Sequence, residues 1–195
     1  RRVSLIQPVL PDRQILLFTR LQKRFRWTKC LPPVRGGRER QDSVAGGLAA
    51  LPAEVEIIMI HDAARPFVTP AIINRVLDAA RRHGAALAAV PVHDTVKRSA
   101  RAGRVLKTVD RRGLWLAQTP QAFRADLLRE AHRRAVADRR RGTDESALIE
   151  SMGHPVHLVL GSLLNFKITT PEDLALARSL TRGKAPAVCK SGGHA

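Results

Sequence analysis

The 195-residue sequence contains no tyrosine, only two cysteines and no apolar run long enough to cross a membrane. Cys30 and Cys189 lie near opposite ends of the chain and belong to no CxxC or Cys/His motif. Their spacing excludes a zinc site and a disulfide framework, and it is typical of proteins from a reducing cytosol. We therefore expect no metal site built from protein ligands, no membrane association and a location in the bacterial cytoplasm.

Aromatic residues are also scarce, and acidic residues are outnumbered. Only five Phe and two Trp occur, and 34 Lys and Arg face 17 Asp and Glu, which gives a formal net charge of +17. Such a charge favours anionic partners, either nucleic acid or phosphorylated small molecules. Because few aromatic side chains are available to stack on bases, nucleic acid is the less favoured partner. A drift of the composition toward arginine and alanine explains the charge equally well.

The first thirty residues are basic, almost free of acids, and start with Arg rather than Met. This composition is similar to that of a plastid transit peptide, although Pro8 and Pro11 would interrupt the amphipathic helix of such a peptide. A truncated or rearranged reading frame explains the start equally well, so both interpretations stay open. Residues 1–35 show no helical or strand period, and we expect them to form a separate basic segment.

From residue 36 onward, strand-like and helix-like segments alternate. The apolar runs expected to form strands are 55–60, 85–90, 156–160 and, more briefly, 166–168. Helical spacing is found after residue 43 and over 72–84, 123–136, 143–152 and 170–181. This alternation predicts an α/β fold of three layers around a mainly parallel sheet, over residues 36–181. Residues 182–195 contain several Gly and Lys, and we expect them to form a disordered tail.

Four hydroxyl residues are predicted to cap helices, and one hairpin is expected outside the layers. The caps are Ser43, Thr69, Thr143 and Thr170, and a proline follows the second and the fourth of them. The segments 104–109 and 114–117 predict two shorter strands joined by a turn, which together form a protruding arm.

Polar residues directly follow two of the predicted strands. Asp62 follows the strand that ends at Ile60, and Thr95 follows the strand that ends at Val90. Ligands of such sheets bind beyond the carboxyl ends of the strands, so both clusters are expected to face one crevice. Taken alone, Asp62 is better explained as the cap of a turn that pairs with Arg65, and only its motif context favours a contact with a ligand.

A series of spaced motifs identifies a family that this chain closely resembles. The motifs are Gly-Gly-Arg-Glu-Arg-Gln-Asp-Ser (36–43), His-Asp-Ala-Ala-Arg-Pro (61–66), Asp-Thr-Val-Lys-Arg (94–98), Val-Asp-Arg (109–111), Gln-Thr-Pro-Gln (118–121), Thr-Asp-Glu (143–145) and Asn-Phe-Lys-Ile-Thr (165–169). Together they resemble the 2-C-methyl-D-erythritol 4-phosphate cytidylyltransferases of non-mevalonate isoprenoid biosynthesis, over roughly residues 36–181. The resemblance implies a Rossmann-like nucleotidyltransferase sheet with a protruding β-arm.

The resemblance also implies a reaction. The phosphate of methylerythritol phosphate attacks the α-phosphorus of CTP, pyrophosphate leaves, and Mg²⁺ bridges the CTP phosphates. In transfers of this kind the protein mainly gathers two anions, holds them in line and stabilises the charge that develops. CTP, a polyol phosphate and Mg²⁺ are therefore the expected partners.

The resemblance assigns roles to particular residues. Arg111 and Lys167 are the expected catalytic residues, which position the methylerythritol phosphate, one through a planar fork and the other as a compact point charge. The residues expected to contact the erythritol hydroxyls and phosphate are Asp62, Arg65, Thr95, Thr119 and Thr143. The residues expected at the nucleotide are Gly37 and Ser43 at the cytosine and Asp62 and Ala63 at the ribose.

Dimers are a further expectation from the resemblance. Family members place the protruding arm, here about residues 95–120, across a neighbouring subunit. A homodimer is therefore expected, in which Arg111 serves the active site of the other protomer.

The sequence departs from the family pattern at its start. Family members begin with a strand, a glycine-rich loop that contains Arg, and a Pro-Lys-Gln step, whose backbone N–H groups hold the CTP phosphates. No glycine precedes Gly36, and the Pro-Asp-Arg-Gln of residues 11–14 is a faint echo of that step. We assign no catalytic residue upstream of residue 36, and we expect no strand–helix–strand unit there.

Two other functions stay open. One is cytidylyl transfer to another polyol phosphate, such as ribitol phosphate, because enzymes of that kind share most of these motifs. The other is a catalytically inactive basic remnant that binds nucleotides or RNA.

Overall fold

The computed structural model describes residues 2–182, so the tail predicted from residue 182 lies almost entirely outside the described residues. The strands are β1 (Val9–Leu10), β2 (Val34–Arg35), β3 (Ile57–Ile60), β4 (Ala85–Pro91), β5 (Val96–Ser99), β6 (Val105–Val109), β7 (Trp115–Arg124) and β8 (His157–Leu160). The helices are α1 (Asp12–Phe25), α2 (Arg40–Ala50), α3 (Pro70–His83), the short 3₁₀ turn Arg101–Gly103, α4 (Ala125–Ala137), α5 (Glu145–Ser151) and α6 (Pro171–Thr181).

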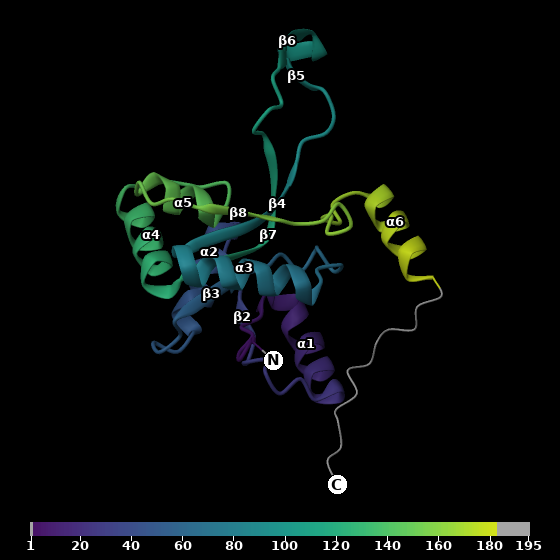
Figure 1. Cartoon of the computed structure of the whole chain (residues 1–195). Helices are drawn as coiled ribbons and strands as arrows, with labels where there is room; N and C mark the ends of the chain where they lie inside the picture. The colour runs from purple at the N-terminus through teal and green to yellow at the C-terminus, as the bar shows by residue number, and fades with distance from the viewer. Residues whose placement is uncertain (1, 183–195) are drawn as a thin grey trace.

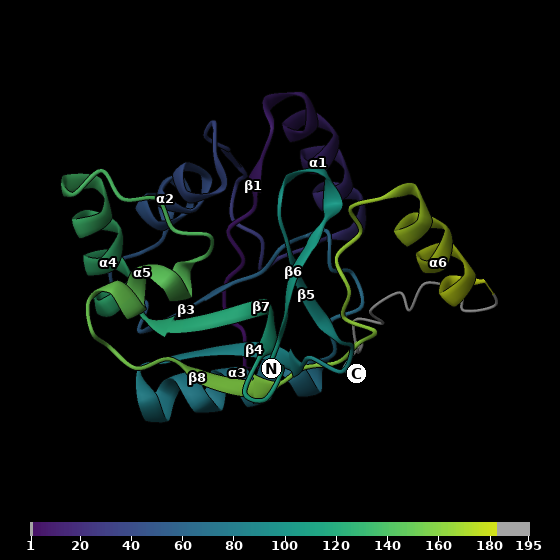
Figure 2. The same cartoon turned by 90° about the horizontal axis from the view of Figure 1, so that it is seen from above.

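A four-stranded sheet lies between two helical layers (Figures 1 and 2). α3 packs on one face, where the fully buried Val76 meets the small alanines of β4 and β7. On the other face α2, α4 and α5 pack around Phe123 and Leu128, which are both fully buried. The predicted three-layer α/β fold is therefore confirmed.

The sheet is mixed, with the strand order β3-β7-β4-β8. β3, β4 and β8 share one direction, and β4 pairs with β8 in parallel. β7 runs the opposite way between β3 and β4, with Phe123 opposite both Ile58 of β3 and Ala85 of β4. The expectation of a mainly parallel sheet is thus refined: the strands predicted from apolar runs are parallel, but an antiparallel strand separates two of them.

β7 was missed as a central strand because its sequence is polar. The sequence predicted a short strand of the arm over 114–117 and a helix that starts at residue 123. In the structure the strand continues to Arg124, and α4 begins at Ala125. Gln118, Thr119 and Gln121 are all at most 6% exposed within β7. Buried polar side chains of this kind are stable only when they are hydrogen-bonded, and their partners come from distant segments.

The arm is made of β5 and β6, which pair antiparallel and project away from the layers (Figure 1). A protruding β-arm was predicted, but its expected strands were 104–109 and 114–117. The prediction is correct for β6 and wrong for its partner, because the chain after residue 114 enters the main sheet instead. Leu114 accepts a hydrogen bond from the backbone of Val92 at 3.0 Å, at the base of the arm.

Residues 6–35 form a small strand–helix–strand unit, contrary to our expectation. β1 and β2 are parallel, with Val9 opposite Val34, and α1 connects them. Pro11 does not interrupt the helix, because it is the residue that directly precedes it, where a missing N–H has no effect. Leu16 remains 73% exposed, so the apolar side chains of α1 are only partly covered.

The predicted caps divide into two correct and two wrong assignments. Thr69 caps α3, and Thr170 forms a capping box with Asp173 at the start of α6. Ser43 and Thr143 are not caps, because carboxylates that stand closer to each helix start take that position: Glu39 for α2 and Asp144 for α5. Residues 166–168 form no strand, although Ile168 donates a backbone hydrogen bond to Ala64 at 2.8 Å.

Candidate functional site

The loop that follows β3 is held by a single hydroxyl of the neighbouring strand. Thr119 of β7 is 4% exposed, and its Oγ1 accepts a hydrogen bond from the backbone N–H of Asp62 at 3.0 Å. The same oxygen lies 3.0 Å from Nδ1 of His61, whose Nε2 is 3.1 Å from the carbonyl of Arg65. The pairing of β3 with β7 therefore fixes where the Asp62 carboxylate stands.

Asp62 is the meeting point of two cations. Its Oδ2 lies 3.0 Å from Nζ of Lys167, and its Oδ1 lies 3.3 Å from Nε of Arg40. Arg40 also reaches Oε2 of Glu145 through Nη1 at 2.6 Å. Four charged side chains from α2, the β3 loop, α5 and the segment before α6 thus form a continuous chain, which we call the charge chain.

The charge chain shifts the pKa values of its two carboxylates in opposite directions. Burial raises the pKa of Asp62, but the hydrogen bond and charge of Lys167 and the charge of Arg40 outweigh burial and hold it below its ordinary value. Burial also raises the pKa of Glu145, and there Arg40 offsets the effect only in part. Asp62 is therefore the carboxylate that stays ionised most readily.

Lys167 is positioned by its buried neighbour Asn165. Nδ2 of Asn165 donates to Oε1 of Gln118 at 3.1 Å and to the carbonyl of Thr119 at 2.9 Å, and Asn165 is 0% exposed. A Cβ at Gly161 would lie 2.4 Å from that same Gln118 oxygen, so glycine is required for this close approach. The network ties the Asn-Phe-Lys motif to the Gln-Thr-Pro-Gln motif of β7.

Arg65 links the same two segments from the other side. Its Nη1 donates to the carbonyl of Asn165 at 2.8 Å, and its buried Nε has no hydrogen-bond partner. Burial lowers the pKa of Arg65, while the charge of Asp62 raises it. The simple turn interpretation had paired Arg65 with Asp62. In the structure Arg65 instead bonds the backbone of the segment that carries Lys167.

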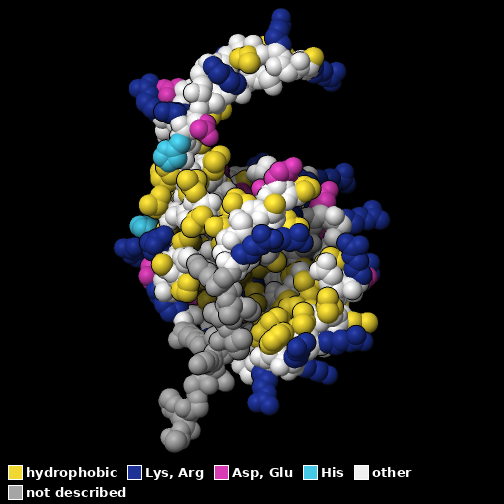
Figure 3. Space-filling view, turned by 90° about the vertical axis from the view of Figure 1, so that its right-hand side faces the viewer, with side chains coloured by type: hydrophobic (Ala, Val, Ile, Leu, Met, Phe, Trp, Pro, Cys, Tyr) yellow, Lys and Arg dark blue, Asp and Glu magenta, His cyan; other side chains and the backbone are white. Residues whose placement is uncertain are grey.

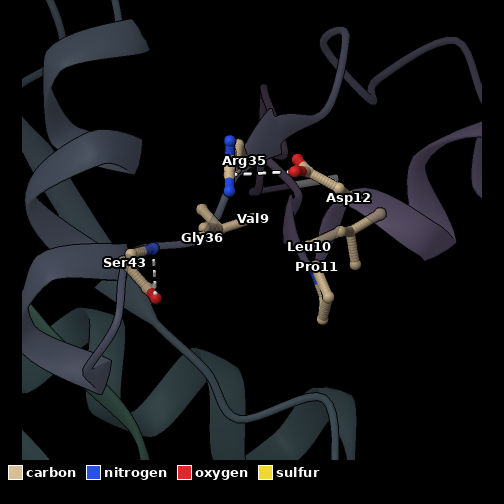
Figure 4. A pocket seen from close by; sticks show the side chains of 8 residues that line it. Val9, Leu10, Pro11, Asp12, Arg35, Gly36 and Ser43 are labelled. Atoms are coloured by element: carbon tan, nitrogen blue, oxygen red, sulfur yellow. Dashed lines mark hydrogen bonds and ion pairs between the residues drawn. The ribbon is translucent and has the colours of Figure 1, made fainter.

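Gly37 and Ser43 lie together beside a cavity of about 280 Å³ (Figure 4). The backbone N–H of Gly37 donates to Oγ of Ser43 at 3.0 Å. The lining residues are Val9, Leu10, Pro11, Asp12, Arg35, Gly36, Gly37 and Ser43. The residues upstream of 36 therefore contribute a large part of the wall, which the sequence interpretation did not foresee.

The remaining predicted site residues stand apart from the charge chain. Thr95 precedes β5, Thr143 lies in the turn before α5, and both are exposed. Arg111 is exposed near the base of the arm, where it donates to the carbonyl of His93. Within residues 2–182, no hydrogen bond or ion pair connects these three residues to Asp62 or Lys167. Ala63 lies exposed next to Asp62 in the loop after β3.

Sequence reasoning missed Arg40 and Glu145 as members of the site. Both residues lie inside motifs that were recognised, but neither was given a role. The available signal was Glu145, a glutamate at the start of the apolar helix α5. A glutamate is seldom buried unless it is paired, so its position called for a cationic partner. Nothing in the sequence indicated that its partner would be Arg40.

The described residues hold no group of three or more His, Cys, Asp or Glu side chains that could bind a metal ion. No described helix is long and apolar enough to span a membrane. Basic side chains are scattered over the face shown in Figure 3, with acidic and apolar side chains between them, and the arm curves over a hollow beside the body.

Comparisons with known proteins agree on one family. The family model described as 2-C-methyl-D-erythritol 4-phosphate cytidylyltransferase matches residues 3–182, so the match extends upstream of the motif series that starts at residue 36. The chain is 51% identical over 162 residues to the enzyme of that name from Syntrophus aciditrophicus, which covers 83% of this chain and 69% of that protein.

Two further relatives extend the comparison. The chain is 44% identical over 190 residues to the enzyme of the same name from Pelotomaculum thermopropionicum, which covers 97% of this chain and 80% of that protein. The crystal structure of the Thermus thermophilus enzyme superposes with a TM-score of 0.72 at 43% identity, over 78% of this chain and 74% of that one.

Proposed function

The chain belongs to the 2-C-methyl-D-erythritol 4-phosphate cytidylyltransferase family, and from this premise we propose that it transfers CMP from CTP to 2-C-methyl-D-erythritol 4-phosphate. The products are the cytidine diphosphate derivative of methylerythritol and pyrophosphate, in isoprenoid biosynthesis. The observation that carries the proposal in this chain is the pairing of Lys167 with Asp62 at the edge of the sheet.

The reaction joins two anions that repel each other. An oxygen of the methylerythritol phosphate forms a bond to the α-phosphorus of CTP, and the bond from that phosphorus to the bridging oxygen breaks, so that pyrophosphate leaves with the bridging oxygen. The protein's task is to neutralise charge and hold the two phosphates in line. Lysine and arginine side chains suit this task because they stay protonated at neutral pH.

Lys167 is suited to hold the attacking phosphate. Its side chain is 41% exposed, whereas the Asp62 carboxylate it contacts is 17% exposed. The ammonium group is therefore accessible to an incoming phosphate that would take the place of Asp62. Asp62, Arg65, Thr119, Thr95 and Thr143 remain our candidates for the contacts to the sugar hydroxyls and phosphate.

The cavity beside Gly37 and Ser43 is our proposed cytosine pocket. Its volume of about 280 Å³ lies near the lower end of small-molecule sites. A Cβ at Gly37 would lie 2.3 Å from Cβ of Asp42, so only glycine lets this loop close onto the start of α2. Asp62 and Ala63 would then lie on the ribose side.

Mg²⁺ is proposed to enter together with the nucleotide. The described residues offer no cluster of three metal ligands, and Mg²⁺ is commonly held by substrate phosphates with few protein ligands. The donor set of this site therefore fits an ion that the CTP phosphates carry, and such an ion supplies positive charge at the phosphates.

A homodimer is proposed to complete the site. Arg111 has no contact with the charge chain in one protomer, and it stands near the base of an arm that projects from the body (Figure 1). An arm that lies across a second copy would carry Arg111 to the other protomer's Lys167. Two basic groups from two protomers would then hold one phosphate.

The proposed activity is tested by pyrophosphate release. The purified chain is incubated with CTP, Mg²⁺ and methylerythritol phosphate, and in a parallel arm with ribitol phosphate. We expect release with methylerythritol phosphate, and its loss in Lys167→Ala. Release with ribitol phosphate alone would favour the other polyol phosphate, and no release with either would contradict both enzyme functions. RNA binding with a steep salt dependence and no competition by CTP would then support the inactive remnant.

A further inference from the structure

The two ends of the charge chain differ in their exposure to solvent. The carboxyl group of Glu145 is 1% exposed and the side chain of Arg40 33%, whereas Lys167 at the other end is 41% exposed. The buried end holds the shorter contact, 2.6 Å between Arg40 and Glu145, against 3.0 Å between Lys167 and Asp62. Arg40 is thus held by Glu145, which has almost no access to solvent. Lys167 has no such buried partner beyond Asp62 and is itself open to solvent.

We propose that Arg40, anchored by Glu145, is a positioning residue that keeps Asp62 paired when Lys167 leaves it for the substrate phosphate. The inference rests on the proposed function. It assigns a role to two residues that do not touch the reacting atoms.

Charge balance gives the physical reason. Arg40 and Lys167 together neutralise Asp62 and Glu145, so these four side chains carry no net charge before the substrate binds. When Lys167 turns to a phosphate, Asp62 would be left as a mostly buried carboxylate without a cation, and such a group is strongly unfavourable. Arg40 removes this penalty because its guanidinium fork contacts Asp62 through Nε and Glu145 through Nη1 at the same time.

The groups that face Asp62 come from three segments. Arg40 approaches from α2 and Lys167 from the segment before α6, while His61 and Arg65 flank it within its own loop. The two contacting cations lower the pKa of Asp62 against the effect of burial. Without Arg40, Asp62 would therefore take up a proton at a higher pH. While Asp62 is ionised, Lys167 would be the single cation that contacts it, and leaving it would cost more.

A purely structural role for the pair is the competing explanation. Arg40 joins the start of α2 to the start of α5, so it could simply brace the two helices. However, removing both members of a buried ion pair leaves no uncompensated buried charge, which is the main cause of the stability loss when one member is removed. A brace would change stability and leave the pH profile and the separate KM values as they are.

The double variant Arg40→Gln/Glu145→Gln separates the two explanations, because it removes the ion pair without leaving a buried charge. The matched control is Arg124→Gln/Asp126→Asn, which removes a surface pair at the start of α4 whose atoms are 2.5 Å apart and whose side chains are 60% and 65% exposed. We expect the KM for methylerythritol phosphate to rise about ten- to hundredfold, as for the loss of one charged hydrogen bond. The KM for CTP should not change, and the acidic limb of kcat/KM should move to higher pH.

Arg40→Lys is the second variant, in case the double variant does not fold. Lysine lacks the fork, and it must stay with the buried Glu145, so Asp62 loses its second cation in this variant as well. The same rise in the KM for the polyol phosphate is expected. An unchanged KM and an unchanged acidic limb in both variants would overturn the proposal.

A titration separates failure of this inference from failure of the proposed function. The ¹³Cγ signal of Asp62 reports its protonation without any turnover, and we expect its pKa to be higher in the double variant than in the unmodified chain. An unmodified chain and a surface control that both release no pyrophosphate would contradict the proposed function. An Asp62 titration that is the same in both chains would contradict the role given to Arg40.

Discussion

Lys167 and Arg40 each take a different oxygen of the same carboxylate. Nζ of Lys167 is 3.0 Å from Oδ2 of Asp62, and Nε of Arg40 is 3.3 Å from Oδ1. Asp62 thereby holds a lysine, from a distant part of the chain, beside the carboxyl end of β3. The most exposed member of the group is also the one to which we assign the substrate phosphate.

The first prediction concerns Lys167 itself. In Lys167→Gln the side chain keeps nearly its length but loses the charge that would stabilise the transferring phosphates. The rate of pyrophosphate release should fall by about two to three orders of magnitude. Lys23→Gln in α1 is the matched control and should release pyrophosphate at the unmodified rate. Equal rates in the two variants would remove Lys167 from the reaction.

The second prediction concerns the glycine at the cytosine pocket. A Cβ at Gly37 would lie 2.3 Å from Cβ of Asp42 and 3.0 Å from its carbonyl carbon, so Gly37→Ala must displace the loop. We expect a higher KM for CTP and an unchanged KM for methylerythritol phosphate, measured with each substrate varied in turn.

The control for this variant lies in the adjoining helix α2. A Cβ at Gly46 would meet only the carbonyl oxygen of Arg35, at an ordinary 3.7 Å. Gly46→Ala should keep both KM values and stabilise the helix by about 0.5–1 kcal/mol. If both alanine variants behaved alike, the loop would not contact the nucleotide.

The third prediction concerns pH and His132 of α4. The ring is 6% exposed and neither nitrogen has a hydrogen-bond partner in the structure. Burial, assisted by the charge of Arg40, lowers its pKa below the ordinary 6.5. The unfolded chain therefore binds the proton first, and the free energy of unfolding should decrease as the pH falls below about 6.5.

Denaturant unfolding at several pH values measures this slope. His132→Leu should reduce the loss of stability between about pH 7 and pH 5, because the proton-binding group is gone. Val136→Ala, which shortens an exposed side chain of the same helix that cannot titrate, should leave the slope unchanged. A slope that is equally steep without His132 would assign the effect to other groups.

The fourth prediction concerns the homodimer. If Arg111 of one protomer serves Lys167 of the other, then Arg111→Ala and Lys167→Ala are each inactive but complement each other. Mixed and re-equilibrated dimers should recover about a quarter of the unmodified activity, since half of the dimers are mixed and each has one complete site. No recovery, with mixed dimers verified by mass, would place Arg111 in its own protomer's site or outside the reaction.

The helix starts and apolar strands that were predicted correctly are features determined by residues close together in the sequence. Thr69 and Thr170 were recognised as caps, because a hydroxyl before a proline and a helical period defines a helix start by itself. The apolar runs of β3 and β4 were recognised because each consists of consecutive apolar residues. The predictions for Ser43 and Thr143 were wrong because the caps are Glu39 and Asp144. The sequence does not show at which of these neighbouring residues each helix begins.

The motif series, read as a set, determined the family and named Lys167, Asp62 and Thr119, which the fold brings into contact through Asp62. It did not reveal that β7 enters the sheet, because Gln118 and Gln121 look too polar for a buried strand until Asn165 and Asp144 are seen to bond them. Nor did it reveal the small unit around α1, whose apolar side chains are left partly exposed.

The sequence by itself thus determined the kind of fold, the family and the individual charged residues, since composition, period and motif are properties of consecutive residues. Only the tertiary structure decided which charges meet. Arg40 pairs with Glu145 because antiparallel β7 draws together segments that the chain order keeps far apart, and burial then makes an unpaired carboxylate unfavourable. Pairing energies of this kind depend on distance and solvent exposure, which no single stretch of sequence contains.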